Sequence, residues 1–106
     1  MATDALVTER TIQRQVVAHF RAMGWSVYPT NQRPTGKRAS RNAKGFPDLW
    51  CMKPGRGGLW FEVKAPNGTQ SSAQVSFQAA CAAAGVKYVC GGLTEAHQIM
   101  GGAWPS

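Results

Sequence analysis

The sequence predicts an α/β fold, with one domain built on a small mixed β-sheet and flanking helices. Its 106 residues can bury one modest core. Short β-rich runs alternate with longer segments whose apolar residues recur at helical spacing. The expected order of helix, strand, hairpin, helix, strand and helix favours helices packed on the faces of one sheet. We find no internal repeat and no linker, so residues 1–106 are expected to form a single domain.

The first helix is expected over residues 8–23. Thr8 is a favourable N-cap residue, Glu9 follows in the first turn, and Gly24 suits the left-handed position after the last turn. Apolar residues at helical spacing form the stripe that we expect to be buried: Ile12, Val16, Phe20 and Met23. Glu9 lies three residues before Ile12, so it projects from the N-terminal end of the face that packs inward.

The remaining elements are separated by turn residues. The stretch "KPGRGG" divides two β-rich runs, and Pro and Gly of this kind favour an antiparallel hairpin. In chain order, the expected elements are a strand at 25–29, hairpin strands at about 47–52 and 59–64, a helix from Ser71 or Ser72 to about Ala84, a strand at 86–90 and a helix at 94–100.

The charge balance is strongly positive, with twelve Lys and Arg against five Asp and Glu, a net charge of +7. This favours an anionic partner, either nucleic acid or an anionic membrane surface, unless the charge is only solubilising. No run is long or apolar enough to span a bilayer, and the N-terminus lacks a charged start followed by an apolar signal core. We therefore expect a soluble cytoplasmic protein with no membrane partner.

One segment, residues 31–45, carries much of this charge and contains no acid. Its basic residues are Arg33, Lys37, Arg38, Arg41 and Lys44. Few apolar residues interrupt it, so we expect a loop with a strong positive field, which would contact phosphates if the anionic partner is nucleic acid. A merely solubilising loop is the alternative.

The three cysteines are too widely spaced for a zinc ribbon or a redox pair, and each lies in an apolar segment. They are expected to be reduced core residues, because free cysteine packs as a small hydrophobe. These residues are Cys51, Cys81 and Cys90.

The hairpin pattern places two of the five acids on one face. Alternating residues form an apolar face if odd-numbered positions of the two strands align: Leu49, Cys51, Leu59, Phe61 and Val63. The same register sets Asp48, Glu62 and Lys64 together on the opposite face. The alternative is a solvated strand face on which Lys64 makes an ordinary ion pair.

Two carboxylates held this close on half-buried strands repel each other. Opposed positions in an antiparallel pair have Cβ atoms about 5 Å apart, and diagonal positions are about 7–8 Å apart. A divalent cation relieves the repulsion, and hard oxygen ligands suit Mg²⁺. We expect Lys64 to orient the attacking water and to balance charge on phosphorus, while the metal activates the water. Glu9 would complete the shell of the cation directly or through water.

The pair Pro47-Asp48 followed by Glu62-Val63-Lys64 resembles the motif of the PD-(D/E)XK phosphodiesterase superfamily. Within it, the chain is similar to the virus-type replication-repair nuclease (VRR-NUC) domain from Glu9 to about Met100. The supporting stretches are "GFPDLW", "WFEVKAPNG", "SSAQVSFQ" and "AGVKYVCGGLTEAHQIM". The resemblance implies a restriction-endonuclease-like core and a DNA endonuclease that depends on Mg²⁺ or Mn²⁺.

The same resemblance implies roles for individual residues. Asp48, Glu62 and the backbone carbonyl of Val63 would hold metal. Lys64 would be the motif lysine, Glu9 the acid of the first helix, and Gln74 an additional catalytic position. Stand-alone domains of this size from phages and bacteria resemble Holliday-junction resolvases that act in DNA repair as homodimers. Branched DNA, a homodimer and a bacterial or phage-infected host are therefore expected, while the basic 33–44 segment lies outside the shared motif.

Several alternatives stay open. Glu9 could simply be a first-turn acid that interacts with the helix dipole, and Gln74 a polar surface residue. Trp50 and Trp60 share the polar hairpin face and could pack under the first helix or stack on bases. The whole chain could be a non-catalytic nucleic-acid-binding module that retains the nuclease fold, or a nuclease directed at RNA. A pure binding module has no electrostatic reason to assemble Asp48, Glu62 and Lys64.

Overall fold

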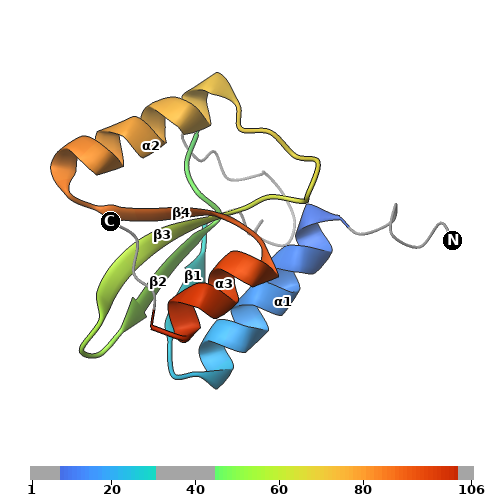
Figure 1. The fold of residues 1–106 in the computed structure, drawn as a ribbon, viewed down its shortest axis with the longest axis vertical. Coiled ribbons are helices and arrows are strands. Elements are labelled where there is room, and N and C mark those ends of the chain that lie inside the picture. The colour runs from blue at the N-terminus through green and yellow to red at the C-terminus, as the bar shows by residue number, and fades with distance from the viewer. Residues whose placement is uncertain (1–7, 31–44, 103–106) are drawn as a thin grey trace, which may run out of the picture.

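The computed structural model describes residues 8–30 and 45–102 and has the expected order of elements (Figure 1). In chain order, they are α1 (Glu9–Ala22), β1 (Ser26–Pro29), β2 (Leu49–Lys53), β3 (Gly57–Val63), α2 (Ser72–Ala84), β4 (Lys87–Gly91) and α3 (Leu93–Met100). The basic residues Arg33, Lys37, Arg38, Arg41 and Lys44 lie outside the described residues. None of the helices in the described ranges has the length and hydropathy that crossing a bilayer requires.

The four strands form one mixed sheet in the order β1-β2-β3-β4. Strands β1, β2 and β3 are antiparallel neighbours, and β4 runs parallel to β3. Helix α2 supplies the crossover that a parallel pair needs. The predicted small mixed sheet with flanking helices is confirmed.

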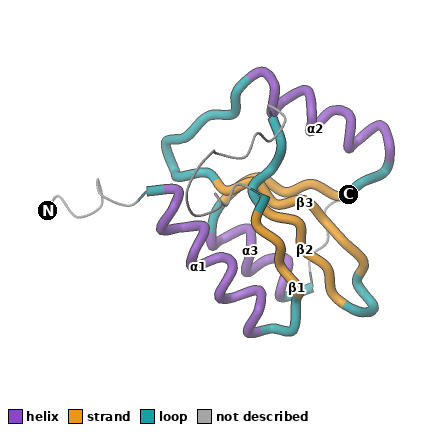
Figure 2. The backbone as a smooth tube through the Cα atoms, turned by 180° about the vertical axis from the view of Figure 1, so that it is seen from behind, coloured by secondary structure: helices purple, strands orange, loops and turns teal. Residues whose placement is uncertain are grey.

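Helices α1 and α3 lie side by side on one face of the sheet, and α2 lies on the other (Figures 1 and 2). The core fills the first of these interfaces, where the rings of Phe20 and Phe61 are 5.7 Å apart. Its buried members are Ile12, Val16, Phe20, Trp25, Val27, Leu49, Cys51, Leu59, Phe61, Val63, Ala96 and Ile99. The odd-numbered face of the hairpin is therefore the apolar face, as predicted.

The opposite face of the sheet carries an aromatic cluster. The rings of Trp50 and Trp60 are 4.8 Å apart, and Phe77 of α2 lies 5.7 Å from Trp60. These tryptophans thus pack beneath α2 and not beneath α1, which covers the other face. Helix α2 is only lightly covered, because Cys81 is its one buried residue.

The helix ends follow the local sequence. The hydroxyl of Thr8 accepts a 3.2 Å hydrogen bond from the amide of Thr11, which caps α1 as expected. Ser71, and not Ser72, caps α2. Gly85 ends α2 in the left-handed conformation at φ +76°, where a side chain would be strained.

The cysteines are all free thiols, as expected. Cys51 and Cys81 are buried, which confirms the prediction for these two. The prediction that Cys90 belongs to the core is wrong, because Cys90 is half-buried on the outermost strand β4.

Candidate functional site

Asp48 and Glu62 come together at adjacent ends of β2 and β3. The register pairs Leu49 with Phe61, so Asp48 stands at the level of Glu62, immediately before β2 begins. Leu49 and Phe61 point into the core, and the neighbouring positions therefore project to the other face. The sequence pattern thus correctly predicts that the two acids share one side of the hairpin.

Asp48 is held across the hairpin by a backbone contact. Its Oδ2 accepts a 2.8 Å hydrogen bond from the amide of Val63. Burial raises the pKa of Asp48 above its ordinary value, and the Val63 hydrogen bond opposes that rise. The charges of Glu62 and Glu9 raise the pKa further, whereas Lys64 lowers it. Ionised Asp48 is therefore disfavoured by its surroundings until more positive charge is supplied.

Glu62 is the one charged residue fully buried in the described part of the chain, with 0 % of its surface exposed. Its Oε1 accepts a hydrogen bond from the hydroxyl of Tyr88. Its Oε2 has no hydrogen-bond partner among the described residues. The ammonium of Lys64 lies 3.2 Å from Oε2 and balances the charge of the carboxylate. Oε2 of Glu62 is thus a buried acceptor beside Lys64 that can accept a further interaction.

Lys64 follows β3 directly and keeps its side chain largely covered, at 14 % exposure. Its backbone amide donates a 2.9 Å hydrogen bond to the carbonyl of Gly91. This bond belongs to the pairing of Val63 with Gly91 and ties the backbone of Lys64 to the end of β4. The ion pair of Lys64 with Glu62 joins two side chains on the same face of one strand. The predicted role of Lys64 in the reaction stays a prediction.

Glu9 reaches the same end of the sheet from the first residue of α1. Its Oε2 accepts a 3.4 Å hydrogen bond from the amide of Ala65, and its charge raises the pKa of Asp48. The loop after β3 passes close by, since a Cβ at Gly68 would lie 2.8 Å from the same Oε2. The side chain is exposed, so Glu9 stands at the rim of the site.

Gln74 is engaged elsewhere. Its side-chain Oε1 accepts a 2.8 Å hydrogen bond from the backbone amide of Ser71, and its backbone amide donates a 3.2 Å hydrogen bond to the Ser71 hydroxyl. This reciprocal pair is the capping box of α2. A helix-capping role is thus visible for Gln74, and its catalytic role stays a prediction. The role of the Val63 carbonyl also stays a prediction.

Sequence reasoning missed Tyr88 and Gln70, which complete the surroundings of Glu62. The side-chain amide of Gln70 donates a 3.2 Å hydrogen bond to the Tyr88 hydroxyl. Burial and the neighbouring Glu62 carboxylate raise the pKa of Tyr88 far above its ordinary range. The sequence predicts the strand at 86–90 but not its neighbour or register, which set Tyr88 beside Trp60. The one signal in the sequence is the alternation of Tyr88 and Cys90 along this strand, which predicts that they share a face.

The donor set fits a hard divalent cation. It offers two carboxylates, one with a buried oxygen that has no hydrogen-bond partner among the described residues. Within residues 8–30 and 45–102, no group of three or more His, Cys, Asp or Glu is arranged to hold a metal. A cation here would therefore take its other ligands from water, backbone carbonyls and phosphate oxygens. Mg²⁺ is commonly bound in this way, and carboxylates also suit Mn²⁺.

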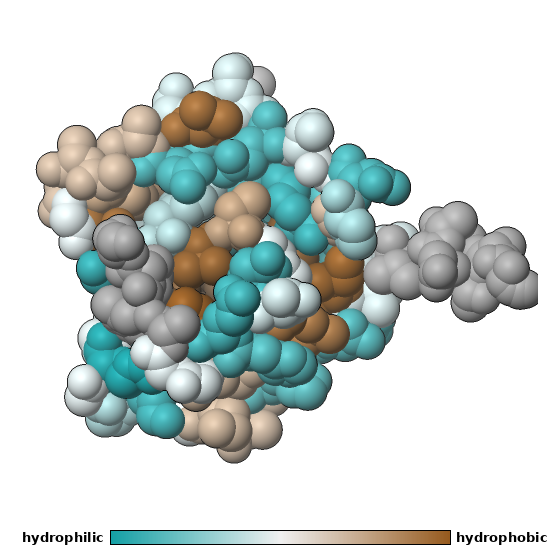
Figure 3. Space-filling view, in the orientation of Figure 1, coloured by the Kyte–Doolittle hydropathy of each residue, from teal (hydrophilic) through white to brown (hydrophobic). Residues whose placement is uncertain are grey.

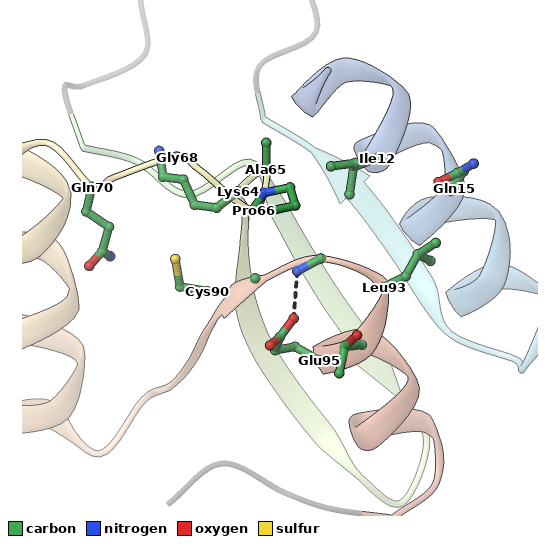
Figure 4. Close-up of a pocket in the computed structure, with 13 residues that line it drawn as sticks. Ile12, Gln15, Lys64, Ala65, Pro66, Gly68, Gln70, Cys90, Leu93 and Glu95 are labelled. Carbon is green, nitrogen blue, oxygen red and sulfur yellow. Dashed lines mark hydrogen bonds between the residues drawn. The ribbon is translucent and has the colours of Figure 1, made fainter. Parts of the chain in front are cut away.

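A hollow of about 640 Å³ adjoins this site. Figure 4 shows Lys64, Gln70 and Cys90 along one part of its wall, with Ile12 and Leu93 along another. Apolar residues gather in the strip between α2 and the two-helix layer, and polar residues flank them (Figure 3). Lys64 belongs to both features, so the hollow and the carboxylate site share a wall.

No protein-family model matches the chain, and no curated protein matches it. A solved structure described as "VRR_NUC domain" is similar over 91 % of this chain and 97 % of that chain, with 23 % identity and a TM-score of 0.66. At this identity the likeness shows the fold. The chain has the VRR-NUC fold, and the restriction-endonuclease-like α/β core predicted from the motifs is confirmed.

Proposed function

We propose that this protein is a DNA endonuclease that depends on Mg²⁺ or Mn²⁺ and hydrolyses phosphodiester bonds. The observation that carries the proposal is the buried Oε2 of Glu62, which has no hydrogen-bond partner among the described residues and lies 3.2 Å from the Lys64 ammonium. Asp48 lies at the same level of the hairpin. The VRR-NUC fold supports the nuclease assignment.

The proposed role of each residue follows from its charge. Asp48 and Glu62, with the Val63 carbonyl, would hold the cation, which when bound supplies positive charge and acidifies water. The Lys64 ammonium stabilises negative charge that develops on the phosphoryl oxygens. The attacking water gives up one proton as its oxygen bonds to phosphorus, one phosphorus–oxygen bond to deoxyribose breaks, and the departing oxygen takes up one proton. Lys64 would also orient the attacking water, and Glu9 at the rim would complete the shell of the cation directly or through water. Gln74 is the further catalytic position that the motif implies.

The partner that we propose is DNA, and its phosphates would be bound by the basic segment. If the five basic residues Arg33, Lys37, Arg38, Arg41 and Lys44 all engage, log affinity should fall with log salt at a slope of about −4 to −5. The sequence alone shows no evident base-reading motif, so recognition of DNA shape is expected. Branched DNA such as a Holliday junction, a homodimer with two sites, and a cytoplasmic role in repair extend the proposal.

A cleavage panel tests the proposal. The purified protein is incubated with an end-labelled four-way junction, a flap, a linear duplex and an RNA duplex, each with Mg²⁺, with Mn²⁺ and with EDTA. We expect metal-dependent cutting of DNA, fastest on the junction. Binding of DNA without cutting under every condition would favour the non-catalytic module, and preferential cutting of the RNA duplex would favour an RNA-directed nuclease.

A further inference from the structure

Tyr88 links strand β4 to the carboxylate of Glu62. The parallel register pairs Trp60 with Tyr88 and Glu62 with Cys90, so Tyr88 and Glu62 are diagonal neighbours on one face of the sheet. Diagonal neighbours lie within reach of an aromatic side chain. The Tyr88 hydroxyl uses this reach to donate a hydrogen bond to Oε1 of Glu62.

A second hydrogen bond orients that hydroxyl. The side-chain nitrogen of Gln70 donates to the Tyr88 oxygen at 3.2 Å and to Oε1 of Gln78 at 3.0 Å. A phenol carries one hydrogen and accepts through its lone pairs. Because Gln70 occupies a lone pair of the oxygen, the hydrogen is directed toward Glu62. Gln70 therefore holds Tyr88 in its donor orientation.

Packing fixes the ring that carries the hydroxyl. The rings of Tyr88 and Phe77 are 6.4 Å apart, and Phe77 also contacts Trp60 at 5.7 Å. Aromatic pairs at such distances are favourable in tilted and edge-on arrangements. The hydroxyl is thus located by the aromatic cluster beneath α2, independently of its bond to Glu62.

We propose that Tyr88 is a positioning residue, which orients Glu62 so that Oε2 is the oxygen presented to the divalent cation. This inference rests on the proposed function. With Oε1 occupied by Tyr88, Oε2 is left as the buried oxygen beside Lys64 that has no hydrogen-bond partner among the described residues. Hydrogen bonds to ligating carboxylates from outside the metal shell orient them in this way.

The competing explanation is that Tyr88 only satisfies a buried oxygen. Tyr88→Phe separates the two, because it keeps the ring and removes the hydroxyl. If the bond only satisfies Glu62, its loss would lower the free energy of unfolding and leave cation affinity unchanged. A positioning bond would also weaken cation binding and lower kcat, while KM for DNA, which phosphate contacts set, would not change.

The experiment compares four proteins: the wild type, Tyr88→Phe, Gln70→Met, and the matched control Tyr28→Phe. Tyr28 is the other of the two tyrosines in the chain and is 53 % exposed on β1. Mn²⁺ binding is measured by calorimetry on the protein without DNA. Cleavage of the four-way junction then gives kcat, KM and the Mn²⁺ concentration for half-maximal rate. Thermal unfolding in EDTA reports stability.

We expect Tyr88→Phe to weaken Mn²⁺ binding by about 10- to 100-fold and to lower kcat, with KM unchanged and Tyr28→Phe like the wild type. Gln70→Met should also weaken Mn²⁺ binding and lower kcat, but by less than Tyr88→Phe does. If Tyr88→Phe does not fold, Gln70→Met is the variant that tests the proposal. Wild-type Mn²⁺ affinity in a folded Tyr88→Phe protein would overturn the inference alone. A wild-type protein that neither binds Mn²⁺ nor cuts DNA would overturn the proposed function as well.

Discussion

The backbone amide of Val63 donates a 2.8 Å hydrogen bond to Oδ2 of Asp48, which joins the residue before β2 to the last residue of β3. The bond fixes one oxygen of Asp48 and stabilises its ionised form. Burial nevertheless raises the pKa of Asp48, and the charges of Glu62 and Glu9 contribute to that rise. The folded chain therefore holds this carboxylate in a place where ionisation costs more than in water, and a bound cation would offset that cost.

Replacing Asp48 should separate stability from activity. In EDTA we expect Asp48→Asn to unfold at a higher temperature than the wild type, because it removes a charge that burial and two acids disfavour. A change of 1 kcal/mol shifts the midpoint of a domain of this size by roughly 4–8 °C. Addition of Mg²⁺ should stabilise the wild type but not the variant, and the variant should not cut DNA. A lower midpoint for Asp48→Asn in EDTA would contradict this account.

Glu62→Gln should abolish cleavage and leave DNA binding nearly intact. We expect the turnover of junction DNA to fall about 1,000-fold or more, because the lost cation contributes several kcal/mol to the transition state. The matched control is Glu95→Gln, since Oε1 of Glu95 accepts from the amide of Gly92 and glutamine can retain that bond. Cleavage rates and junction affinity are measured for both variants. Equal rates for Glu62→Gln and Glu95→Gln would remove Glu62 from the site.

Local signals explain why so much of this fold can be read from the sequence. The caps at Thr8 and Gly85 depend on single residue types, and the side-chain alternation of the hairpin sets Asp48 and Glu62 on one face. Contacts distant in sequence could not be predicted. The hydrogen bond between Glu9 and the amide of Ala65 depends on how α1 lies against the sheet.

Other parts of the site depend on pairings that the sequence leaves undetermined. The contact between Tyr88 and Glu62 follows from the parallel register of β3 and β4, which no turn connects. Gln74 is different, because the spacing of Ser71 and Gln74 is itself a capping-box signature. The competing structural role of Gln74 was therefore readable before the structure.

Cys51 should make the stability of the protein fall in alkali. Burial raises the pKa of its thiol from 9.0 to about 12. The folded state thus keeps the proton more tightly than the unfolded chain, and this contribution to stability is complete below pH 9.0 and lost as pH rises toward about 12. Cys51→Ala should lower the urea midpoint at neutral pH but show a shallower alkaline fall. If the urea midpoints of the wild type and Cys51→Ala fell in parallel from about pH 8 to about pH 11, the alkaline loss of stability would not come from the Cys51 thiol.

Arg38→Ala combined with Arg41→Ala should weaken DNA binding more than turnover. Removing two phosphate contacts should reduce the salt slope of binding by about 2, because each contact releases roughly one counterion. A control that also removes two charges is Arg21→Gln with Lys53→Gln, in the last turn of α1 and at the end of β2. Affinity is measured across a salt series, and kcat at saturating DNA. Loss of kcat in the Arg38 and Arg41 variant would contradict the assignment of these residues to phosphate binding.

Lys64→Met should reduce kcat about 100- to 1,000-fold with a smaller change in DNA affinity, because it removes a positive charge from the reacting phosphate. It also leaves the buried carboxylate of Glu62 without its ion pair, which costs roughly 3–5 kcal/mol of stability. Adding Glu62→Gln removes that unpaired charge, so the double variant should recover much of the lost stability and none of the activity. Denaturant unfolding of these proteins checks the predicted stabilities, and single-turnover cleavage checks the predicted activities. A double variant no more stable than Lys64→Met would show that the 3.2 Å pair does not couple the two residues in solution.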